Sequence, residues 1–410
     1  MTPDDSKVPR AGKPGRLPRG VWALGFVSLF MDISSEMIHG LLPVFLVGTL
    51  GVSAVALGFI EGIAESTAAI TKLFSGVWSD RLGHRKPLAL LGYGMAALTK
   101  PLFPLANSVT TVFVARLIDR IGKGIRGAPR DALVADLAPP EQRGAAFGLR
   151  QTLDTIGAFV GPLLAMGLMV WLAGNVRAVF WLATVPALIA VAILVVAVKE
   201  PGSPRPKAVR GNPFAGFHWR LFPPAFWRLV AVAALFTLTR FSEAFLVLRA
   251  CDGGGLPMSY APLALVAMNL AYVLSAYPAG ALSDRLPRHY LLVVGCAVMV
   301  GADLLLALGS GPGFIFAGIA LWGLHIGLTE GLLAALTADS APPELRGTAF
   351  GIVNLVRGVM LFAASFLAGG LWSSFGPKIT FLTGAGLATL AALAAIRADP
   401  RTALAHPQHQ

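Results

Sequence analysis

Residues 76–87 read GVWSDRLGHRKP and connect two long apolar stretches of the chain. A shorter version of this segment, GALSDRL, returns at 280–286, which is 204 residues later. A second segment, PPEQRGAAFG at 139–148, returns as PPELRGTAFG at 342–351, which is 203 residues later. Two motifs repeated at nearly the same offset indicate an internal duplication. We therefore expect a fold that is built from two related halves.

The chain around these motifs is too apolar for a soluble protein. It has 410 residues, of which 55% are hydrophobic and 13% are charged, whereas a soluble chain carries roughly 25% charged residues. The apolar residues come in stretches of about 20, the length of helix that crosses a bilayer core of about 30 Å. This composition excludes a soluble enzyme, a nucleic-acid binder, a collagen and a disordered tail. It predicts an all-α polytopic membrane protein.

We predict twelve transmembrane helices, arranged as two six-helix bundles related by pseudo-symmetry. The predicted helices are 21–48, 53–79, 86–107, 109–127, 144–171, 178–198, 225–250, 258–283, 290–309, 313–338, 347–374 and 376–397. The segment between the halves is rich in Pro, Gly and Arg, which predicts a linker. The predicted organisation is a basic tail, an N-terminal half, a linker, a C-terminal half and a second tail, at 1–20, 21–198, 199–224, 225–397 and 398–410.

The net charge of +12 is distributed unevenly between the two sides of the predicted bundle. Twenty-two Lys and Arg residues lie on the side of the tails and the linker, and four lie on the other side: Lys100, Arg177, Arg249 and Lys378. Lys and Arg concentrate in cytoplasmic loops. We therefore expect a multi-pass protein of a bacterial cytoplasmic (inner) membrane, with both termini cytoplasmic. Its expected partners are lipid, a small-molecule substrate and protons, with no nucleic acid, and a monomer is sufficient.

The segment 76–87 resembles the loop signature G-x-x-x-D-R-x-G-x-R-R/K of the major facilitator superfamily. The resemblance covers essentially the whole chain, including the second copy, in which Pro287 replaces the equivalent of Gly83. It implies a transporter of twelve helices that binds its solute between two rocking halves. It also implies a gating role at the cytoplasmic face for Gly76, Asp80, Arg81, Gly83, Arg85, Asp284 and Arg285.

The predicted fifth helix contains Gly157, Gly161 and Pro162. This spacing resembles the G-x-x-x-G-P core of the superfamily's antiporter signature, which is found mostly in exporters. Small residues four apart allow two helices to approach closely, and a proline inside a helix bends it. Ordinary packing of small residues is the alternative interpretation.

The predicted fourth helix contains four charged residues within eight positions, namely Arg116, Asp119, Arg120 and Lys123. This run loosely resembles the fourth-helix motif R-x-x-x-G-x-G of the same superfamily, although Arg120 stands where the motif has glycine. Arg116 lies deepest and is predicted to be a buried functional cation. Lys123 is placed equally well as a residue that extends toward the membrane surface.

Nine acidic residues fall inside the predicted spans: Asp32, Glu36, Glu61, Glu65, Asp119, Asp154, Glu243, Asp303 and Glu330. Each charge at the bilayer centre costs about 2.5–3.5 kcal/mol on insertion scales. We therefore expect these carboxyl groups to face a cavity, to pair with a cation or to hold a proton. A carboxyl group that loses its hydration binds its proton more tightly, which suits a proton carrier.

The clearest cluster is on the first helix, where Asp32, Glu36 and His39 share one face because they are four and three residues apart. Arg240 and Glu243 lie on the corresponding helix of the second half. The predicted site for substrate and proton coupling comprises Asp32, Glu36, His39, Glu61, Glu65, Arg116, Asp119, Asp154, Arg240 and Glu243. Local pairing of Glu65 with Lys72, and of Glu243 with Arg240, is the structural alternative.

Other charged residues receive weaker assignments. Arg357, His325 and Glu330 are candidates to reach the cavity from the tenth and eleventh helices. Lys100 and Asp303 lie on helices that the resemblance places at the periphery. A local pair or an exposed helix end is the only role that the sequence indicates for these two residues.

The leading functional hypothesis is a secondary transporter that works by alternating access and couples protons to the efflux of a small cationic or amphipathic solute. No Walker A sequence occurs, so ATP is not the expected energy source, and no cofactor is expected. One alternative is an exporter of a divalent metal or a metal chelate, with Asp32, Glu36 and His39 as ligands. Another is a proton-coupled uptake permease. An enzyme is not expected, because neither HExxH nor GxSxG is present.

Overall fold

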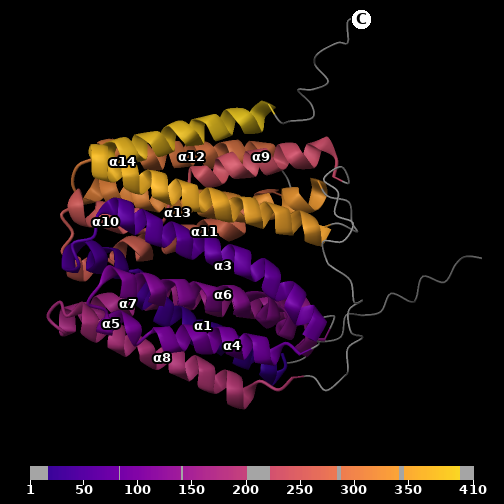
Figure 1. The fold of residues 1–410 in the computed structure, drawn as a ribbon. Helices are drawn as coiled ribbons and strands as arrows, with labels where there is room; N and C mark the ends of the chain where they lie inside the picture. The colour runs from indigo at the N-terminus through magenta and orange to yellow at the C-terminus, as the bar shows by residue number, and fades with distance from the viewer. Residues whose placement is uncertain are drawn as a thin grey trace, which may run out of the picture.

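The computed structural model describes residues 17–82, 84–139, 142–200, 222–283, 288–340 and 346–397. Every regular element within these residues is a helix (Figure 1). The first half contains α1 (Arg19–His39), α2 (Leu42–Val44), η1 (Phe45–Thr49), α3 (Ala54–Leu82), α4 (Lys86–Thr99), α5 (Leu102–Leu105), α6 (Val109–Leu137), α7 (Arg143–Trp171) and α8 (Val176–Ala197). The second half contains α9 (Pro224–Leu238), α10 (Ala244–Asp252), η4 (Met258–Tyr260), α11 (Leu263–Ser283), α12 (Arg288–Leu308), α13 (Pro312–Ser340) and α14 (Arg346–Arg397).

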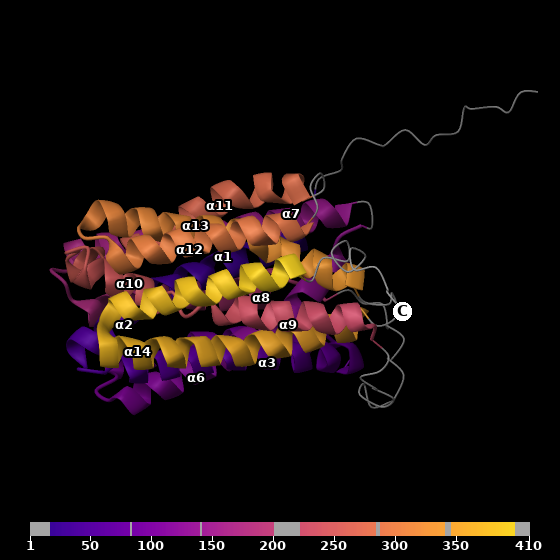
Figure 2. The same cartoon turned by 90° about the horizontal axis from the view of Figure 1, so that it is seen from above.

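The long helices run along one common axis and form two bundles, with α3 lying at the border between them (Figures 1 and 2). Counted over the described residues, the helices make twelve lengthwise passes, because α1 continues through η1, α4 through α5 and α9 through α10, and α14 folds back on itself. We call the end of the molecule at which α8 ends and α9 begins the linker end. The other end is called the opposite end.

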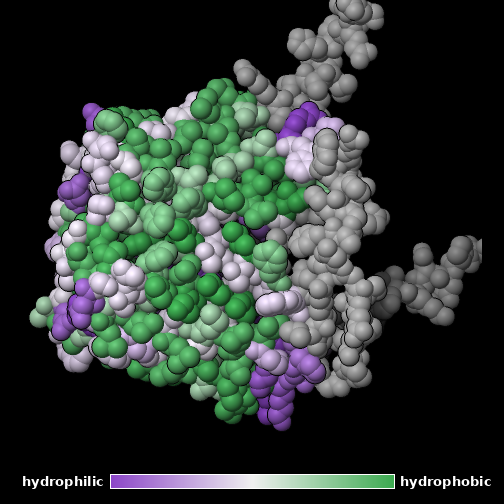
Figure 3. Space-filling model, in the orientation of Figure 1, coloured by the Kyte–Doolittle hydropathy of each residue, from purple (hydrophilic) through white to green (hydrophobic). Residues whose placement is uncertain are grey.

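The outer surface of the bundle is apolar. Figure 3 shows hydrophobic side chains over the middle of the visible face and hydrophilic ones toward its two ends. The described residues contain nine helical stretches long and apolar enough to cross a membrane, one of which is the 48-residue stretch Ala349–Ile396. The helix α6 is not among them because Arg116, Asp119, Arg120 and Lys123 lie within it. The chain is thus a multi-pass membrane protein, as its composition predicts.

The first helix of each half is broken, where the sequence predicts continuous helices at 21–48 and 225–250. The helix α1 ends at His39 and the chain continues through α2 and the π-helix η1. Residues 239–243, between α9 and α10, are not helical. Ser365 of α14 accepts a hydrogen bond from the Ser242 backbone N–H at 3.1 Å, and the Thr239 hydroxyl donates to the Phe236 carbonyl at 2.8 Å. Groups from other helices and from hydroxyl side chains therefore satisfy the backbone that the break exposes.

Two further boundaries differ from the predicted ones. The helix α6 extends to Leu137, ten residues beyond the predicted end, and remains helical through Pro129. The predicted helices 347–374 and 376–397 are joined in α14, which bends at Gly376. Gly376 has φ 80°, a conformation that glycine adopts without steric cost, and Pro377 follows it. This turn lets the last pass of the chain return beside the second bundle.

Three apolar cores show how the two halves meet. One core contains residues of both halves, among them Phe45 of η1 and Phe245 of α10. The other two cores belong to one half each, with Leu24 in the first half and Phe226 in the second, and both lie toward the linker end. The halves are therefore joined through apolar side chains toward the opposite end and are separate toward the linker end.

Small residues bring α3 and α14 into direct contact across the two halves. The Ser66 hydroxyl of α3 donates to the Gly358 carbonyl of α14 at 2.5 Å. A Cβ atom placed on Gly62 would lie 3.1 Å from the Phe362 carbonyl oxygen. Close packing of this kind is available where one helix presents no side chain to the other. This contact joins the two halves along α3 and α14.

Candidate functional site

A cavity of about 830 Å³ lies between the two halves. One wall is formed by α1, α3, α6 and α7, and the other by residues 237–243, α11, α13 and α14. The lining extends to Gln151 and Phe350, near the starts of α7 and α14 at the linker end. The predicted site residues that line it are Asp32, Glu36, His39, Glu65, Asp154, Arg240 and Glu243.

The lining contains one more Lys or Arg residue than it contains acidic residues. The six acidic residues are Asp32, Glu36, Glu65, Asp154, Glu243 and Glu330. The seven basic residues are Lys72, Arg120, Lys123, Arg126, Arg130, Arg240 and Arg357. The lining is therefore not predominantly acidic, because α6 contributes a row of cations to the same wall.

The acids of α3 pair with two arginines of α6. The Arg116 Nη2 donates to the Glu61 Oε2 at 2.8 Å, and at most 2% of either side chain is exposed. Glu65 lies 3.3 Å from the Arg120 guanidinium and 3.8 Å from that of Arg116. Glu65 is therefore held by α6, and the alternative pairing with Lys72 is not formed. Glu61 and Arg116 lie behind the lining and fix the position of Glu65 in front of them.

A second buried pair explains Lys100, which has no clear role in the sequence, and it places the predicted site residue Asp119 behind the cavity lining. The Lys100 Nζ, at the end of α4, donates to the Asp119 Oδ1 of α6 at 2.9 Å and to the Ser35 hydroxyl of α1 at 3.1 Å. Only 1% of the Lys100 side chain and 4% of the Asp119 side chain are exposed. The pair joins α1, α4 and α6 behind the cavity, so Asp119 supports the wall from outside the lining.

The three residues predicted on one face of α1 all reach the cavity. The Glu36 Oε2 lies 3.5 Å from the His39 Nδ1, and the His39 Nε2 lies 3.8 Å from the Glu61 Oε2. Asp32 lies 4.0 Å from the Arg126 guanidinium, which stacks over the Tyr93 ring at 4.8 Å. Asp32 thus has a long contact with its nearest cation. Its carboxylate is the least strongly held of those that line the first half.

The metal-site alternative has no support in the geometry of this cluster. In the part of the chain that the structure describes, no three His, Cys, Asp or Glu side chains form a group that could hold a metal ion. Asp32, Glu36 and His39 lie along the wall and interact mainly with neighbouring arginines and with each other.

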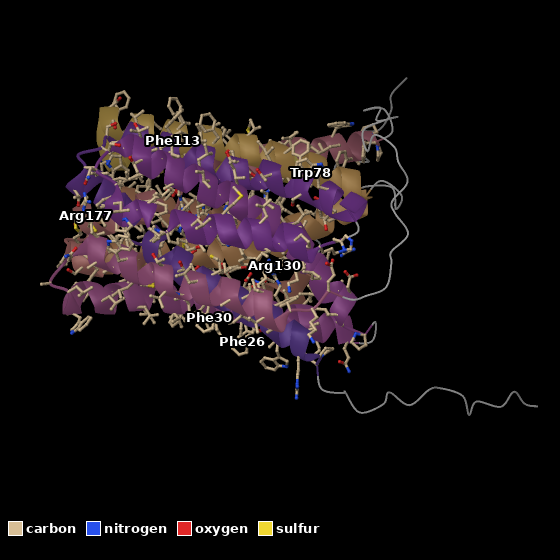
Figure 4. The ribbon with its side chains drawn as sticks, turned by 60° about the horizontal axis from the view of Figure 1, so that its bottom comes forward. Phe26, Phe30, Trp78, Phe113, Arg130 and Arg177 are labelled. Carbon is tan, nitrogen blue, oxygen red and sulfur yellow. The ribbon has the colours of Figure 1, made fainter. Side chains whose placement is uncertain are left out.

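Asp154 belongs to a cluster nearer the linker end. It lies 3.5 Å from Arg130 of α6 and 3.3 Å from Arg150 of its own helix. Both arginines also lie within 3.4 Å of Asp131. Figure 4 shows Arg130 among the helices on this side of the molecule, whereas Arg177 lies at the opposite end. The cluster holds α6 and α7 together where the cavity opens.

In the second half, Glu330 of α13 receives two arginines. The Arg240 Nη1 donates to the Glu330 Oε2 at 2.8 Å, and the Arg357 Nη2 donates to the Glu330 Oε1 at 3.1 Å. Arg240 therefore pairs with Glu330 and not with Glu243. Arg357 and Glu330 reach the cavity, as the sequence suggests, but His325 does not. His325 is fully buried, with its Nδ1 2.7 Å from the Gly295 carbonyl oxygen.

Three charged residues of the lining have no ion-pair partner among the described residues: Lys72, Lys123 and Glu243. The Lys72 side chain packs over Gly127 of α6. A Cβ atom placed on Gly127 would lie 3.4 Å from it. Sequence reasoning assigned no binding role to Lys72 or Lys123. The spacing of Lys123 with Arg116 and Arg120 on the inner face of α6 is the signal that could have identified it.

The glycine motif of α7 sets the position of the α1 acids. A Cβ atom on Gly157 would lie 3.0 Å from the Cβ of Asp32, and one on Gly161 would lie 2.7 Å from the Cβ of Glu36. Pro162 follows inside the same helix. The absence of side chains at the two glycines lets α7 press against α1. The motif and the acids therefore form one structural unit.

Only part of the predicted gating loop can be placed. Gly83, Asp284 and Arg285 lie outside the described residues. Gly76, Asp80 and Arg81 are described only by their helical backbone. Arg85 lies 3.2 Å from Asp136 of α6, and its backbone N–H donates to the Glu200 carboxylate. Arg85 thus connects the start of α4 with the end of α6 and with the residues after α8.

The direction in which the cavity opens can be tested by labelling. Asn354 lines the cavity and is exposed. In a chain without Cys251 and Cys296, Asn354→Cys is expected to react with a membrane-impermeant maleimide added from the linker side. Ser374→Cys, at the opposite end, is the matched control and is expected to react only from the other side. Reaction of Asn354→Cys from the Ser374 side alone would contradict the described opening.

Comparison with known proteins identifies relatives along the whole chain. The family model described as Major Facilitator Superfamily matches residues 24–365 and 255–409. The uncharacterised MFS-type transporter MJ1317 of Methanocaldococcus jannaschii is 31% identical over 382 residues, covering 92% of this chain and 94% of the relative. The inner membrane transport protein YajR of Escherichia coli is 23% identical over 383 residues, covering 91% and 81%. A crystal structure of a mutant peptide transporter POT superposes with a TM-score of 0.79 at 16% identity, covering 96% of each chain.

Proposed function

This chain belongs to the Major Facilitator Superfamily, and from that membership we propose that it exports a small charged solute in exchange for protons by alternating access. The observation that carries the proposal is the charged cavity between the halves, which is closed by a shared apolar core at one end. A cavity that communicates with one side at a time is what alternating access requires.

The charges of the cavity favour an amphipathic solute that carries both a cationic and an anionic group. Lys72 and Lys123 are free to bind an anionic group, and Glu243 on the facing wall and the loosely paired Asp32 are available to bind a cationic one. A purely cationic solute would meet seven Lys and Arg side chains in the same lining. The volume of about 830 Å³ falls within the range of small-molecule sites, roughly 300–1,000 Å³.

Proton coupling is assigned to the carboxyl groups of α1. Asp32 and Glu36 line the cavity, and Asp32 lies 4.0 Å from its nearest guanidinium. A carboxylate with such a loose partner can release the solute's cationic group and take up a proton in its place. One acidic site that binds either the proton or the cation suffices for exchange of the two.

Three observations support the efflux direction and the location in the inner membrane. The Lys and Arg distribution favours a cytoplasmic position for the linker end, toward which the cavity extends. The Gly157, Gly161 and Pro162 motif resembles that of exporters and packs directly against the α1 acids. The relative YajR is named as an inner membrane transport protein.

The test uses inverted membrane vesicles that hold a respiration-driven proton gradient, read with a pH-sensitive dye. The probes are a fluoroquinolone as a zwitterion, tetraphenylphosphonium as a cation and benzoate as an anion. Proton release on adding the fluoroquinolone is expected. Lys123→Gln is expected to weaken the apparent affinity by about tenfold, because a hydrogen bond to a charged group contributes about 1.5–3 kcal/mol.

The matched control is Lys378→Gln, which removes an exposed lysine at the opposite end and is expected to leave the release unchanged. Equal release by tetraphenylphosphonium in wild type and Lys123→Gln would show that the lysines do not select the solute. Silence of all three probes in inverted vesicles, with accumulation of the zwitterion in right-side-out vesicles, would favour the uptake permease.

A further inference from the structure

Asp303 of α12 is a buried acid that the cavity does not include. Its exposure is 0%, and neither carboxyl oxygen has a hydrogen-bond partner among the residues that the structure describes. Its neighbours on α12, Met299, Ala302 and Leu306, all belong to the apolar core shared by the two halves. An acid in this position is conspicuous because buried polar side chains are normally hydrogen-bonded.

The space for this carboxyl group is provided by a glycine of the last pass. A Cβ atom on Gly384 of α14 would lie 2.5 Å from the Asp303 Oδ2 and 3.4 Å from the Phe241 ring. Phe241 belongs to residues 239–243, the break between α9 and α10. Asp303 is therefore enclosed between α12, the second limb of α14 and the broken helix.

An aromatic cluster covers the break beside Asp303. The Phe241 ring centroid lies 5.0 Å from Trp322, 5.4 Å from Phe381 and 5.6 Å from Phe245. These contacts hold the non-helical segment against α13 and α14. Phe241 and Trp322 also line the cavity, so this cluster borders both the cavity and the enclosure of Asp303.

No charged group compensates a carboxylate at this position. The cations of the neighbouring helices have other partners among the described residues. Arg249 of α10 donates to the Leu306 and Gly309 carbonyls, His325 of α13 contacts Gly295, and Arg240 pairs with Glu330. An isolated carboxylate in an apolar interior is so unfavourable that the group binds a proton instead.

We propose that Asp303 is a second proton-binding site, separate from the cavity, which holds its proton in this conformation and exchanges it when the α9–α10 break moves. The same segment carries Arg240, whose guanidinium holds Glu330 in the cavity. Movement of Phe241 would thus link proton exchange at Asp303 to rearrangement of the cavity wall. The use of this proton in the transport cycle rests on the proposed function, whereas the proton site itself does not.

The first experiment is infrared spectroscopy of the full chain in lipid membranes, which needs no solute. The wild type is expected to show the C=O stretch of a protonated carboxyl group at neutral and mildly alkaline pH. Asp303→Asn and Asp303→Leu are both expected to lose that component. Asp252→Asn is the control and is expected to keep it, because Asp252 is exposed at the opposite end, at the last residue of α10. Identical carboxyl bands in wild type and both Asp303 variants would overturn the proposal.

The second experiment measures coupling to conformation, with spin labels on Asn107→Cys and Ser374→Cys, which are exposed at the opposite end of the two halves. Alkaline pH is expected to increase the distance between the labels in the wild type and in Asp252→Asn, but not in Asp303→Asn. The same pH response in Asp303→Asn as in the wild type would overturn the link to the break. Neither outcome depends on the solute. A failure of the proposed function in the vesicle assay is therefore distinguishable from a failure of the Asp303 proposal.

Discussion

Replacing Arg116 by leucine is expected to destabilise the folded protein by about 3–5 kcal/mol, the cost of leaving a buried charge without its partner. The Glu61 side chain is fully buried and its Oε2 depends on the Arg116 Nη2 at 2.8 Å. The other contact of Glu61, with the His39 Nε2, is 3.8 Å long and cannot replace the lost hydrogen bond. The free energy of unfolding is measured by denaturant titration of the purified protein in detergent.

The double variant Arg116→Leu with Glu61→Gln serves as the control for this prediction. It removes both charges, so it is expected to recover most of the lost stability. Glu65 retains Arg120 at 3.3 Å in both variants, so the remaining pair is common to them. If Arg116→Leu alone unfolded at the wild-type denaturant concentration, the buried pair would contribute nothing to stability.

Replacing Gly161 by alanine is expected to abolish most solute-driven proton release and to cost about 1–3 kcal/mol of stability, which is typical of overpacking. The added Cβ would lie 2.7 Å from the Glu36 Cβ and 2.9 Å from the Ile33 carbonyl oxygen. Because the second of these is backbone, α1 as a whole must move away from α7. Asp32 and Glu36 would then be displaced from the cavity wall.

Gly167→Ala is the matched control on the same helix. No atom lies within 4 Å of the position of its Cβ, so the substitution is expected to leave transport unchanged and to raise stability slightly, by about 0.5–1 kcal/mol, because alanine favours a helix interior. The measurements are the vesicle assay for proton release and thermal unfolding in detergent. Equal behaviour of Gly161→Ala and Gly167→Ala would show that the close approach of α7 to α1 has no role in transport.

The all-helical class and the two-half organisation follow from the sequence alone. Their signals are strong because apolar stretches of membrane length and a duplication at a nearly constant offset can be recognised in the residues themselves, without knowing how the helices pack. The breaks in the helices, by contrast, cannot be predicted from local sequence. The backbone at 239–243 is satisfied partly by Ser365, 123 residues away from Ser242, and no pattern within the segment announces such a partner.

The acids of the site are predictable for a similar reason, whereas their partners are not. A charge in an apolar stretch is recognisable wherever it stands, so Asp32, Glu36 and Glu243 are identified directly. Which cation each acid meets depends on how the helices pack. Local spacing suggests pairing Glu65 with Lys72, but α6 presents Arg120 to it at 3.3 Å. Lys100 and Asp119 likewise become a pair only when α4 lies beside α6.

Under the proposed function, the apolar core that joins the halves toward the opposite end also limits how many solute molecules each copy of the protein transports per second. In the described residues, that core and the contact between α3 and α14 join the halves, so under the proposed alternating-access cycle each solute waits for one rearrangement of the halves. Collective motions of that size take microseconds to milliseconds. Flux therefore saturates with solute concentration, and its ceiling in a cell is the number of copies in the membrane multiplied by the cycling rate.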